Sequence, residues 1–140
     1  KLSGVSLRTL YKYYPSKQAM IIAALDYRHT RYLNFLLKDS PGEGVHAVLH
    51  MFDQLKLWMQ QYAPNGCLSI NALSAFPEDE VISSAVQNHK NEVKQLLGEQ
   101  SLNASIASSL FLLHEGVSSA WPIIGDEAVL AAKQSILKLI

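Results

Sequence analysis

The sequence of 140 residues has a single cysteine and lacks any long apolar run. Cys67 alone cannot form an internal disulfide, which is compatible with a reducing cytoplasm. No apolar stretch approaches the roughly 20 residues that span a bilayer. The first apolar residues are interleaved with Arg8, Lys12 and Lys17, unlike the apolar core of a secretory signal peptide. We therefore expect a cytoplasmic protein without a membrane partner.

The sequence also lacks the compact motifs of catalysis. It has no glycine-rich phosphate loop, no nucleophile elbow, and no His and Glu residues at the spacing of a metal motif. The acidic run from Glu78 to Glu80 follows Pro77, an order typical of the first turn of a helix. We predict that the protein is not an enzyme and needs no cofactor.

Composition and charge indicate one globular unit with two unlike ends. Apolar residues make up 49% of the chain and charged residues 17%, as in folded domains. The net charge is zero, but residues 1–38 hold seven basic residues and one acidic residue. The net charge is thus +6 for residues 1–38 and −6 for the rest of the chain. A basic end of this kind is expected of a protein that binds a polyanion. The alternative is two differently solvated surfaces.

Helical periodicity interrupted by proline and glycine predicts an all-α fold. Ser6 and Ser16 are suited to cap two consecutive helices. A later helix begins near Pro77 and keeps an apolar face up to Leu97, with a break predicted at Gly98. The other predicted helices cover about residues 6–14, 16–38, 43–62, 68–75, 103–121 and 127–139, with a break at 122–125.

Residues 4–20, GVSLRTLYKYYPSKQAM, contain no acidic side chain. Gly4 to Ser6 predicts a tight turn and a helix N-cap, the join between the two crossed helices of a helix-turn-helix. The next helix would present Arg8, Thr9, Lys12 and Tyr13 to the outside. Such side chains can reach base edges or hold phosphates, and acids would be repelled by DNA. Lys17, at the start of the following helix, adds a further donor for an anion.

This stretch resembles the recognition motif of TetR-family transcription regulators, which reads like A-G-V-S-x-x-T-L-Y-x-Y-F-P-S-K. Tyr14 stands where phenylalanine is usual in the family. The matching residues are Gly4, Val5, Ser6, Thr9, Leu10, Tyr11, Tyr13, Pro15, Ser16 and Lys17. The match orders many specific residue types without a gap. It therefore identifies the chain as a candidate member of that family.

The resemblance implies an N-terminal helix-turn-helix domain, a C-terminal domain that encloses a small-molecule pocket, and a homodimer built by the last two helices. The domains would be residues 1–38, a partial DNA-binding domain with its connecting helix, and 39–140, the ligand-binding and dimerisation domain. By position, the residues facing bases would be Leu7, Arg8, Thr9 and Lys12, and those holding the DNA backbone would be Ser6, Tyr11, Tyr13 and Lys17. In the family, the first helix and most of the second precede this motif. We therefore expect the 140 residues alone to bind DNA poorly.

The last two predicted helices carry more apolar and small residues than one internal contact needs. Small side chains let helices approach closely, and the surplus could be buried against a second copy through a twofold contact. The alternative is a larger internal core. The candidate dimer residues are Ser105, Ser109, Gly116, Ala120, Val129, Ala132, Ile136 and Ile140.

Histidines on apolar helix faces are the candidate ligand-binding groups. His89 lies centrally on its predicted apolar face and His114 at the margin of another. A polar group in an apolar cavity can orient a ligand, although a hydrogen-bonded core histidine is the alternative. The candidate cavity walls, which could equally be core, are Met51, Trp58, Phe76, Phe111 and Trp121.

Two other patterns have weaker functional interpretations. His46, His50 and Asp53 are spaced as metal ligands on one helical face could be, but they lie beyond the apolar face and favour a solvated surface, so we predict no metal. Cys67 follows Gly66 at a predicted helix start, where a thiol could sense oxidation, but no second cysteine is present to resolve it.

These patterns predict a ligand-responsive DNA-binding transcription regulator. By resemblance it is a repressor that a small-molecule effector releases from double-stranded operator DNA. The helix from Ser16 to Lys38 would link the DNA-reading helix to the body. The alternative is an all-α ligand-binding or dimerisation module that does not bind specific DNA.

Overall fold

The computed structural model describes residues 16–140, which form six α-helices, one 3-10 helix and no strand. The all-α prediction is confirmed. The helices are α2 (Lys17–Leu37), α3 (Val45–Tyr62), α4 (Leu68–Ala75), α5 (Glu80–Ser101), η1 (Ala104–Ile106), α6 (Ala107–Ile124) and α7 (Glu127–Leu139). None of these helices is long and apolar enough to cross a membrane.

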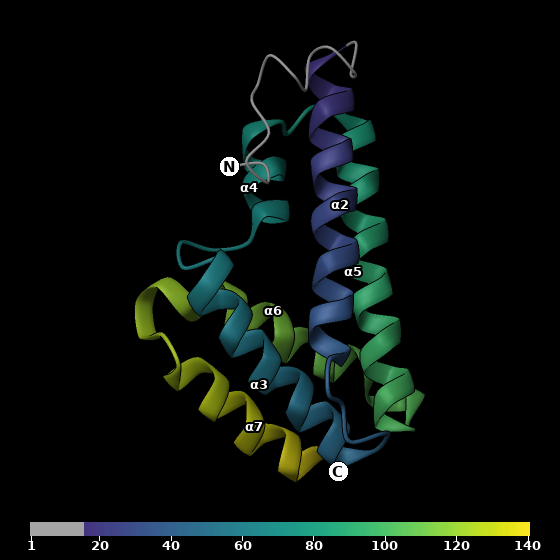
Figure 1. The fold of residues 1–140 in the computed structure, drawn as a ribbon, viewed down its shortest axis with the longest axis vertical. Helices are drawn as coiled ribbons and strands as arrows, with labels where there is room; N and C mark the ends of the chain where they lie inside the picture. Colours follow the sequence, from purple (N-terminus) through teal and green to yellow (C-terminus); the bar gives the residue numbers. More distant parts are fainter. Residues whose placement is uncertain (1–15) are drawn as a thin grey trace.

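Two long helices and a bundle of three make up the architecture. Helices α2 and α5 run side by side along the long axis of the molecule, α3 and α6 pack across their lower half, and α7 packs against α3 and α6 (Figure 1). The short α4 lies beside the upper part of α2 and also contacts α5. Helix α2 therefore extends from the bundle to the end of the molecule at which residue 16 lies.

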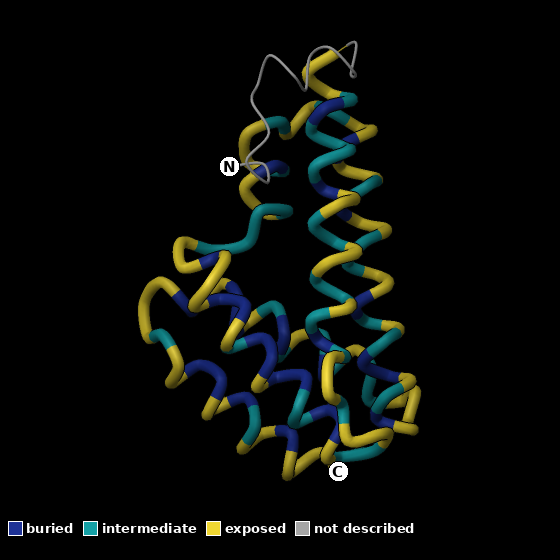
Figure 2. Tube along the Cα trace, in the orientation of Figure 1, coloured by how far each residue is buried: buried dark blue, intermediate teal, exposed yellow. Residues whose placement is uncertain are grey.

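Helix α3 is the centre of the main hydrophobic core. Its apolar residues repeat at helical spacing, and Phe52, Leu55 and Met59 are almost fully buried against α5, α6 and α7. Figure 2 shows the buried residues concentrated along the bundle. Truncating a core phenylalanine such as Phe52 to alanine typically costs about 3–5 kcal/mol. A second, smaller cluster between α2, α4 and α5 contains Leu25, Ala72, Ile82 and Val86.

The helix starts follow local capping chemistry. Ser16 caps α2 as predicted, because its Oγ accepts a hydrogen bond from the Ala19 amide at 3.1 Å. Helix α5 starts at Glu80, later than its predicted start near Pro77, because Asp79 is its N-cap and accepts bonds from the amides of Val81 and Ile82. Gln18 also donates to both carboxylate oxygens of Asp79, at 2.9 and 2.8 Å, and so joins α2 to α5.

Two predicted helix breaks are wrong. Gly98 lies inside α5, where an added Cβ would come within 2.9 Å of the Ala107 Cβ. This glycine allows a close approach of two segments and does not end the helix. Pro122 lies inside α6, which continues to Ile124. An interior proline removes its own amide bond and crowds the carbonyl four residues earlier, but the helix resumes after it, since the Gly125 amide bonds to the Trp121 carbonyl at 2.9 Å.

Candidate ligand-binding pocket

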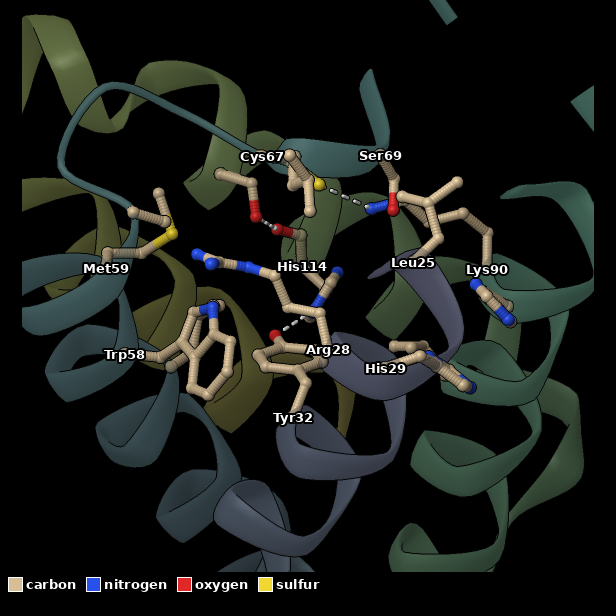
Figure 3. A pocket seen from close by; sticks show the side chains of 16 residues that line it. Leu25, Arg28, His29, Tyr32, Trp58, Met59, Cys67, Ser69, Lys90 and His114 are labelled. Atoms are coloured by element: carbon tan, nitrogen blue, oxygen red, sulfur yellow. Dashed lines mark hydrogen bonds between the residues drawn. The ribbon is translucent and has the colours of Figure 1, made fainter. Parts of the chain in front are cut away.

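A partly open pocket lies where α2, α3, α5 and α6 meet the start of α4 (Figure 3). Its cavity volume is about 60 Å³, which is room for roughly four water molecules. Apolar surface makes up most of the lining, and polar side chains from α2, α5 and α6 interrupt it, as in small-molecule sites. The lining residues are Leu25, Arg28, His29, Tyr32, Leu55, Trp58, Met59, Ala63, Cys67, Leu68, Ser69, His89, Lys90, Val93, His114 and Ser118.

A chain of hydrogen bonds crosses one wall of this pocket. The Tyr32 hydroxyl on α2 lies 2.5 Å from Nε2 of His114 on α6, and Nδ1 of His114 lies 2.7 Å from the Glu115 carboxylate. Lys90 on α5 donates to the same carboxylate at 3.1 Å and lies 3.4 Å from Sγ of Cys67. Because the carboxylate can only accept, His114 carries its hydrogen on Nδ1 and accepts the Tyr32 hydroxyl hydrogen at Nε2.

Burial and the neighbouring charged groups set the protonation states of these hydrogen-bonded side chains. Burial lowers the pKa of His114 below its usual value of 6.5, against the opposing effect of Glu115, so the imidazole is neutral near pH 7. Burial acts to raise the pKa of Glu115, but His114 and Lys90 together hold it below its usual value. Burial, with the nearby Cys67 and Glu115, raises the pKa of Tyr32 well above 10.0. The wall therefore carries one Glu115–Lys90 ion pair and a neutral Tyr32–His114 pair.

Arg28 is the second cation of the pocket. It extends across the cavity toward Trp58 and Met59 (Figure 3). Its Nη2 donates to the Tyr62 carbonyl at the end of α3 at 2.7 Å, and its guanidinium lies 5.5 Å from the Trp58 ring centroid. Burial, together with repulsion from Arg31, lowers the pKa of Arg28. Within residues 16–140 it has no carboxylate partner.

A stacked pair of histidines joins α2 to α5 at the edge of the pocket. The rings of His29 and His89 lie 4.1 Å apart and nearly parallel. His29 contacts Glu92 at 2.9 Å and His89 contacts Asp26 at 2.8 Å, so each ring reaches a carboxylate on the opposite helix. Burial, and to a smaller extent His89, lowers the pKa of His29 against the opposing effect of Glu92. Nδ1 of His89 is buried and has no hydrogen-bond partner in the described part of the chain.

The structure brings together three of the seven candidate ligand-binding residues: Trp58, His89 and His114 line the pocket. The other four lie outside its lining. Met51 and Trp121 are in the main core, Phe111 packs against that core, and Phe76 packs against the smaller cluster. His114 is buried rather than marginal, with 3% exposure. Ligand binding by any of these residues stays a prediction.

Sequence reasoning missed Arg28, Tyr32 and Lys90. Arg28 and Tyr32 are four residues apart, so they lie on one face of α2 with Leu25. This spacing could have indicated that both side chains face the same cavity. Lys90 follows His89 directly and faces Glu115. Nothing local indicates that pairing, because the two residues are 25 positions apart.

Most of the predicted DNA-contacting residues precede the part of the chain that the structure describes. Ser6, Leu7, Arg8, Thr9, Tyr11, Lys12 and Tyr13 lie outside the described residues. Lys17 is the exposed first residue of α2, and its Nζ lies 5.5 Å from the centroid of the Phe76 ring. DNA contact by all eight residues therefore stays a prediction.

The eight candidate dimer residues divide into two groups. Val129, Ala132 and Ile136 pack into this chain's own core, which leaves them little surface for a second copy. Ser105, Gly116 and Ile140 are exposed, and Ser109 and Ala120 are half-buried. The large exposed apolar residues of α6 and α7 are Leu112, Ile123, Ile124, Leu130, Leu137 and Leu139.

The possible metal ligands of α3 have other partners or lie apart. His50 contacts the Lys38 carbonyl at 2.6 Å, and Asp53 accepts a bond from Lys133 at 2.8 Å. Among residues 16–140, no group of three His, Cys, Asp or Glu side chains is arranged to hold a metal ion. Cys67 is a free, half-buried thiol that lines the pocket.

Comparison with known proteins identifies the fold. No protein-family model matches the sequence, and no curated protein matches it. The crystal structure of a TetR-family transcriptional regulator from Streptomyces coelicolor is similar, with a TM-score of 0.81 and 19% sequence identity. The similarity covers 97% of this chain and 74% of that one. The chain therefore has a TetR-like fold, as the resemblance of residues 4–17 predicts.

Proposed function

We propose that this chain belongs to a ligand-responsive, DNA-binding transcription regulator, a homodimer that a small molecule releases from its operator. The observation that carries the proposal is the path of α2. This helix begins at Lys17, directly after the motif that resembles a recognition helix, and Arg28 and Tyr32 in its second half line the pocket. The likeness to a TetR-family regulator over nearly the whole chain supports the same interpretation.

DNA would be bound by the segment that resembles the recognition motif. Leu7, Arg8, Thr9 and Lys12 would contact bases in the major groove, and hydroxyl and lysine groups around them would hold phosphates. The proposed boundary between residues 38 and 39 would assign α2 to the DNA-binding domain, although Arg28 and Tyr32 of this helix line the pocket. A regulator of this kind acts where the DNA is, which would place this protein in the cytoplasm.

The effector would act through the position of α2. The two recognition helices of a dimer must be spaced by one DNA turn, about 34–36 Å. A ligand shifts the protein toward a form that no longer fits this spacing only by binding that form more tightly. Because pocket residues lie on α2 itself, a change in their contacts can alter the inclination of the helix that leads to the DNA-binding segment.

The homodimer would be built by α6 and α7. On α6, Leu112, Gly116 and Ile123 lie on one exposed face at helical spacing, and on α7, Leu130 and Leu137 do the same. Exposed apolar rows on two adjacent helices are typical of a self-complementary contact. This interface differs in part from the sequence-based set, because it uses the exposed residues and not Val129, Ala132 or Ile136.

The proposal is tested by selecting binding sites for the full-length protein from random duplex DNA. A regulator enriches a palindromic site, binds it with a steep dependence on salt, and prefers it strongly over unrelated duplexes. A binding module outside transcription enriches no site. An enzyme would instead convert its ligand, which mass analysis after prolonged incubation detects. If the protein stays bound to its DNA site whenever a small molecule occupies the pocket, the proposed release by an effector is contradicted.

A further inference from the structure

We propose that the pocket selects a small organic anion, a monocarboxylate with an apolar body, through Arg28. This inference rests on the proposed function, because it names the class of effector that the same pocket would bind. The observation that carries it is an imbalance of charge around a mainly apolar cavity.

The charges of the pocket do not cancel. Arg28 and Lys90 line the cavity, and no Asp or Glu is among the described residues that do so. Glu115 lies behind the wall and pairs with Lys90 at 3.1 Å, which accounts for one cation. The His114 imidazole is uncharged and already joined to Tyr32 and Glu115. Of the two cations that line the pocket, Arg28 is therefore the one without a carboxylate partner within residues 16–140.

Arg28 also has donors to spare. A guanidinium offers five N–H donors in a planar fork that fits a carboxylate through two parallel bonds. In the described chain its hydrogen-bond acceptor is the Tyr62 carbonyl, at 2.7 Å. A half-buried arginine that faces an apolar cavity would gain most from a ligand that brings a negative charge.

The remaining walls define the body of the ligand. The apolar lining is supplied by Leu25, Leu55, Trp58, Met59, Leu68 and Val93. Such walls favour a compact hydrocarbon or aromatic group. A single unmatched cation favours a monoanion, because a second negative charge would be buried without a partner.

Binding requires the cavity to widen, because about 60 Å³ is too little for a whole ligand of this kind. Arg28 is the side chain best placed to move, since it extends across the cavity (Figure 3) and its hydrogen bond to the Tyr62 carbonyl can be exchanged for a bond to a carboxylate. That exchange breaks a contact between α2 and the end of α3. Ligand binding would therefore act on α2, the helix that leads to the DNA-binding segment.

The test compares ligands that differ only in their head group. Calorimetric titration of the full-length protein with hexanoate, hexanamide and hexylamine should give the tightest binding for hexanoate. A charge-assisted pair contributes enough to favour the acid over the amide by at least about tenfold. Hexylamine should bind more weakly than the amide, because its ammonium group is repelled by Arg28.

Two variants locate the preference. Arg28→Gln should bring hexanoate down to the affinity of hexanamide and leave hexanamide itself unchanged. Arg31→Gln is the matched control, because it removes the same charge from an exposed position on α2 whose guanidinium lies over the rings of Tyr27 and Tyr62 and outside the pocket lining. This control should keep the full preference for the acid.

A second measurement needs no knowledge of the natural effector. The chain has two tryptophans, so Trp121→Phe leaves Trp58 in the pocket wall as its fluorescent reporter. The ratio of iodide to caesium quenching of Trp58 should exceed the ratio for free N-acetyltryptophanamide, and Arg28→Gln should remove this excess. Hexanoate binding no tighter than hexanamide, or a quenching ratio no higher than that of the free reference, would overturn the proposal. Hexanoate that binds through Arg28 yet leaves DNA affinity unchanged would contradict the proposed function and leave this inference intact.

Discussion

The Tyr32 hydroxyl and Nε2 of His114 lie 2.5 Å apart and join α2 to α6 across the pocket wall. The two residues are 82 positions apart in the chain. His114 is almost fully buried and donates its one ring N–H, on Nδ1, to Glu115. This pair therefore fixes the neutral tautomer of the histidine and holds α2 against the helix that the dimer is proposed to use.

Removing one partner of this pair should destabilise the fold. We expect His114→Phe to cost about 1–3 kcal/mol of unfolding free energy, because it leaves the Tyr32 hydroxyl without its acceptor. Tyr32→Phe should cost less, and the double variant should cost less than the sum. Urea unfolding of all four proteins gives the coupling energy, expected at about 1 kcal/mol. Additive losses would mean that the bond contributes nothing.

Stability should fall as the pH drops below about 6.5. The pKa values of His29 and His114 are lowered from 6.5 in the folded chain, mainly by burial. The unfolded chain therefore takes up protons first, and acidification favours it. The pKa of Glu115 is lowered from 4.5, so a further loss should begin below that pH. Urea unfolding across this range measures the slope, and stability that rises on mild acidification would contradict the burial of these histidines.

Glycine at position 98 should resist substitution. An added Cβ would lie 2.9 Å from the Ala107 Cβ, closer than real contacts allow. Gly98→Ala should therefore destabilise by about 1–3 kcal/mol, despite the gain in helix propensity of about 1 kcal/mol. Gly116, also helical, has nothing within 4 Å of its added Cβ in this chain. Gly116→Ala is thus a control expected to be neutral or stabilising within the monomer, and equal effects at both sites would refute the close approach.

The proposed dimer interface predicts a change of mass in solution. Leu137 on α7 is 61% exposed in the single chain. Leu137→Glu should convert the dimer to a monomer without unfolding it, because it places a charge in an apolar contact. Val81→Glu is the matched control, at a 54% exposed apolar residue in the first turn of α5. Analytical ultracentrifugation that finds both variants dimeric would place the interface elsewhere.

The parts of the fold that sequence predicted well are those set by local chemistry. Ser16 caps α2 because its side chain bonds to an amide three positions away. The predicted bounds of α4 also match the structure, although its N-cap Cys67 makes no side-chain hydrogen bond. Gly98 and Pro122 were misinterpreted as breaks because tertiary packing overrides local propensity. Gly98 is explained by Ala107, which only the folded chain brings beside it.

The pocket was harder to predict than the fold. Trp58, His89 and His114 were candidates because each stood out on a helical face, and all three line the cavity. Arg28 was not a candidate, since a lone arginine on a helix is usually solvated. Arg28 lies across the cavity and donates a hydrogen bond to the Tyr62 carbonyl, which is 34 positions away in the chain. Such pairings arise from topology and leave no pattern within one helix.

The central claim is that the protein reads DNA through residues 4–17 and responds through the pocket. Fluorescence anisotropy of the full-length protein on its selected duplex, with Arg8→Ala and Lys12→Ala alongside, tests it most directly. We predict tight, salt-sensitive binding to that duplex that each substitution weakens strongly. Weak binding that is equal on all duplexes and indifferent to both substitutions would contradict the account and favour a ligand-binding module without an operator.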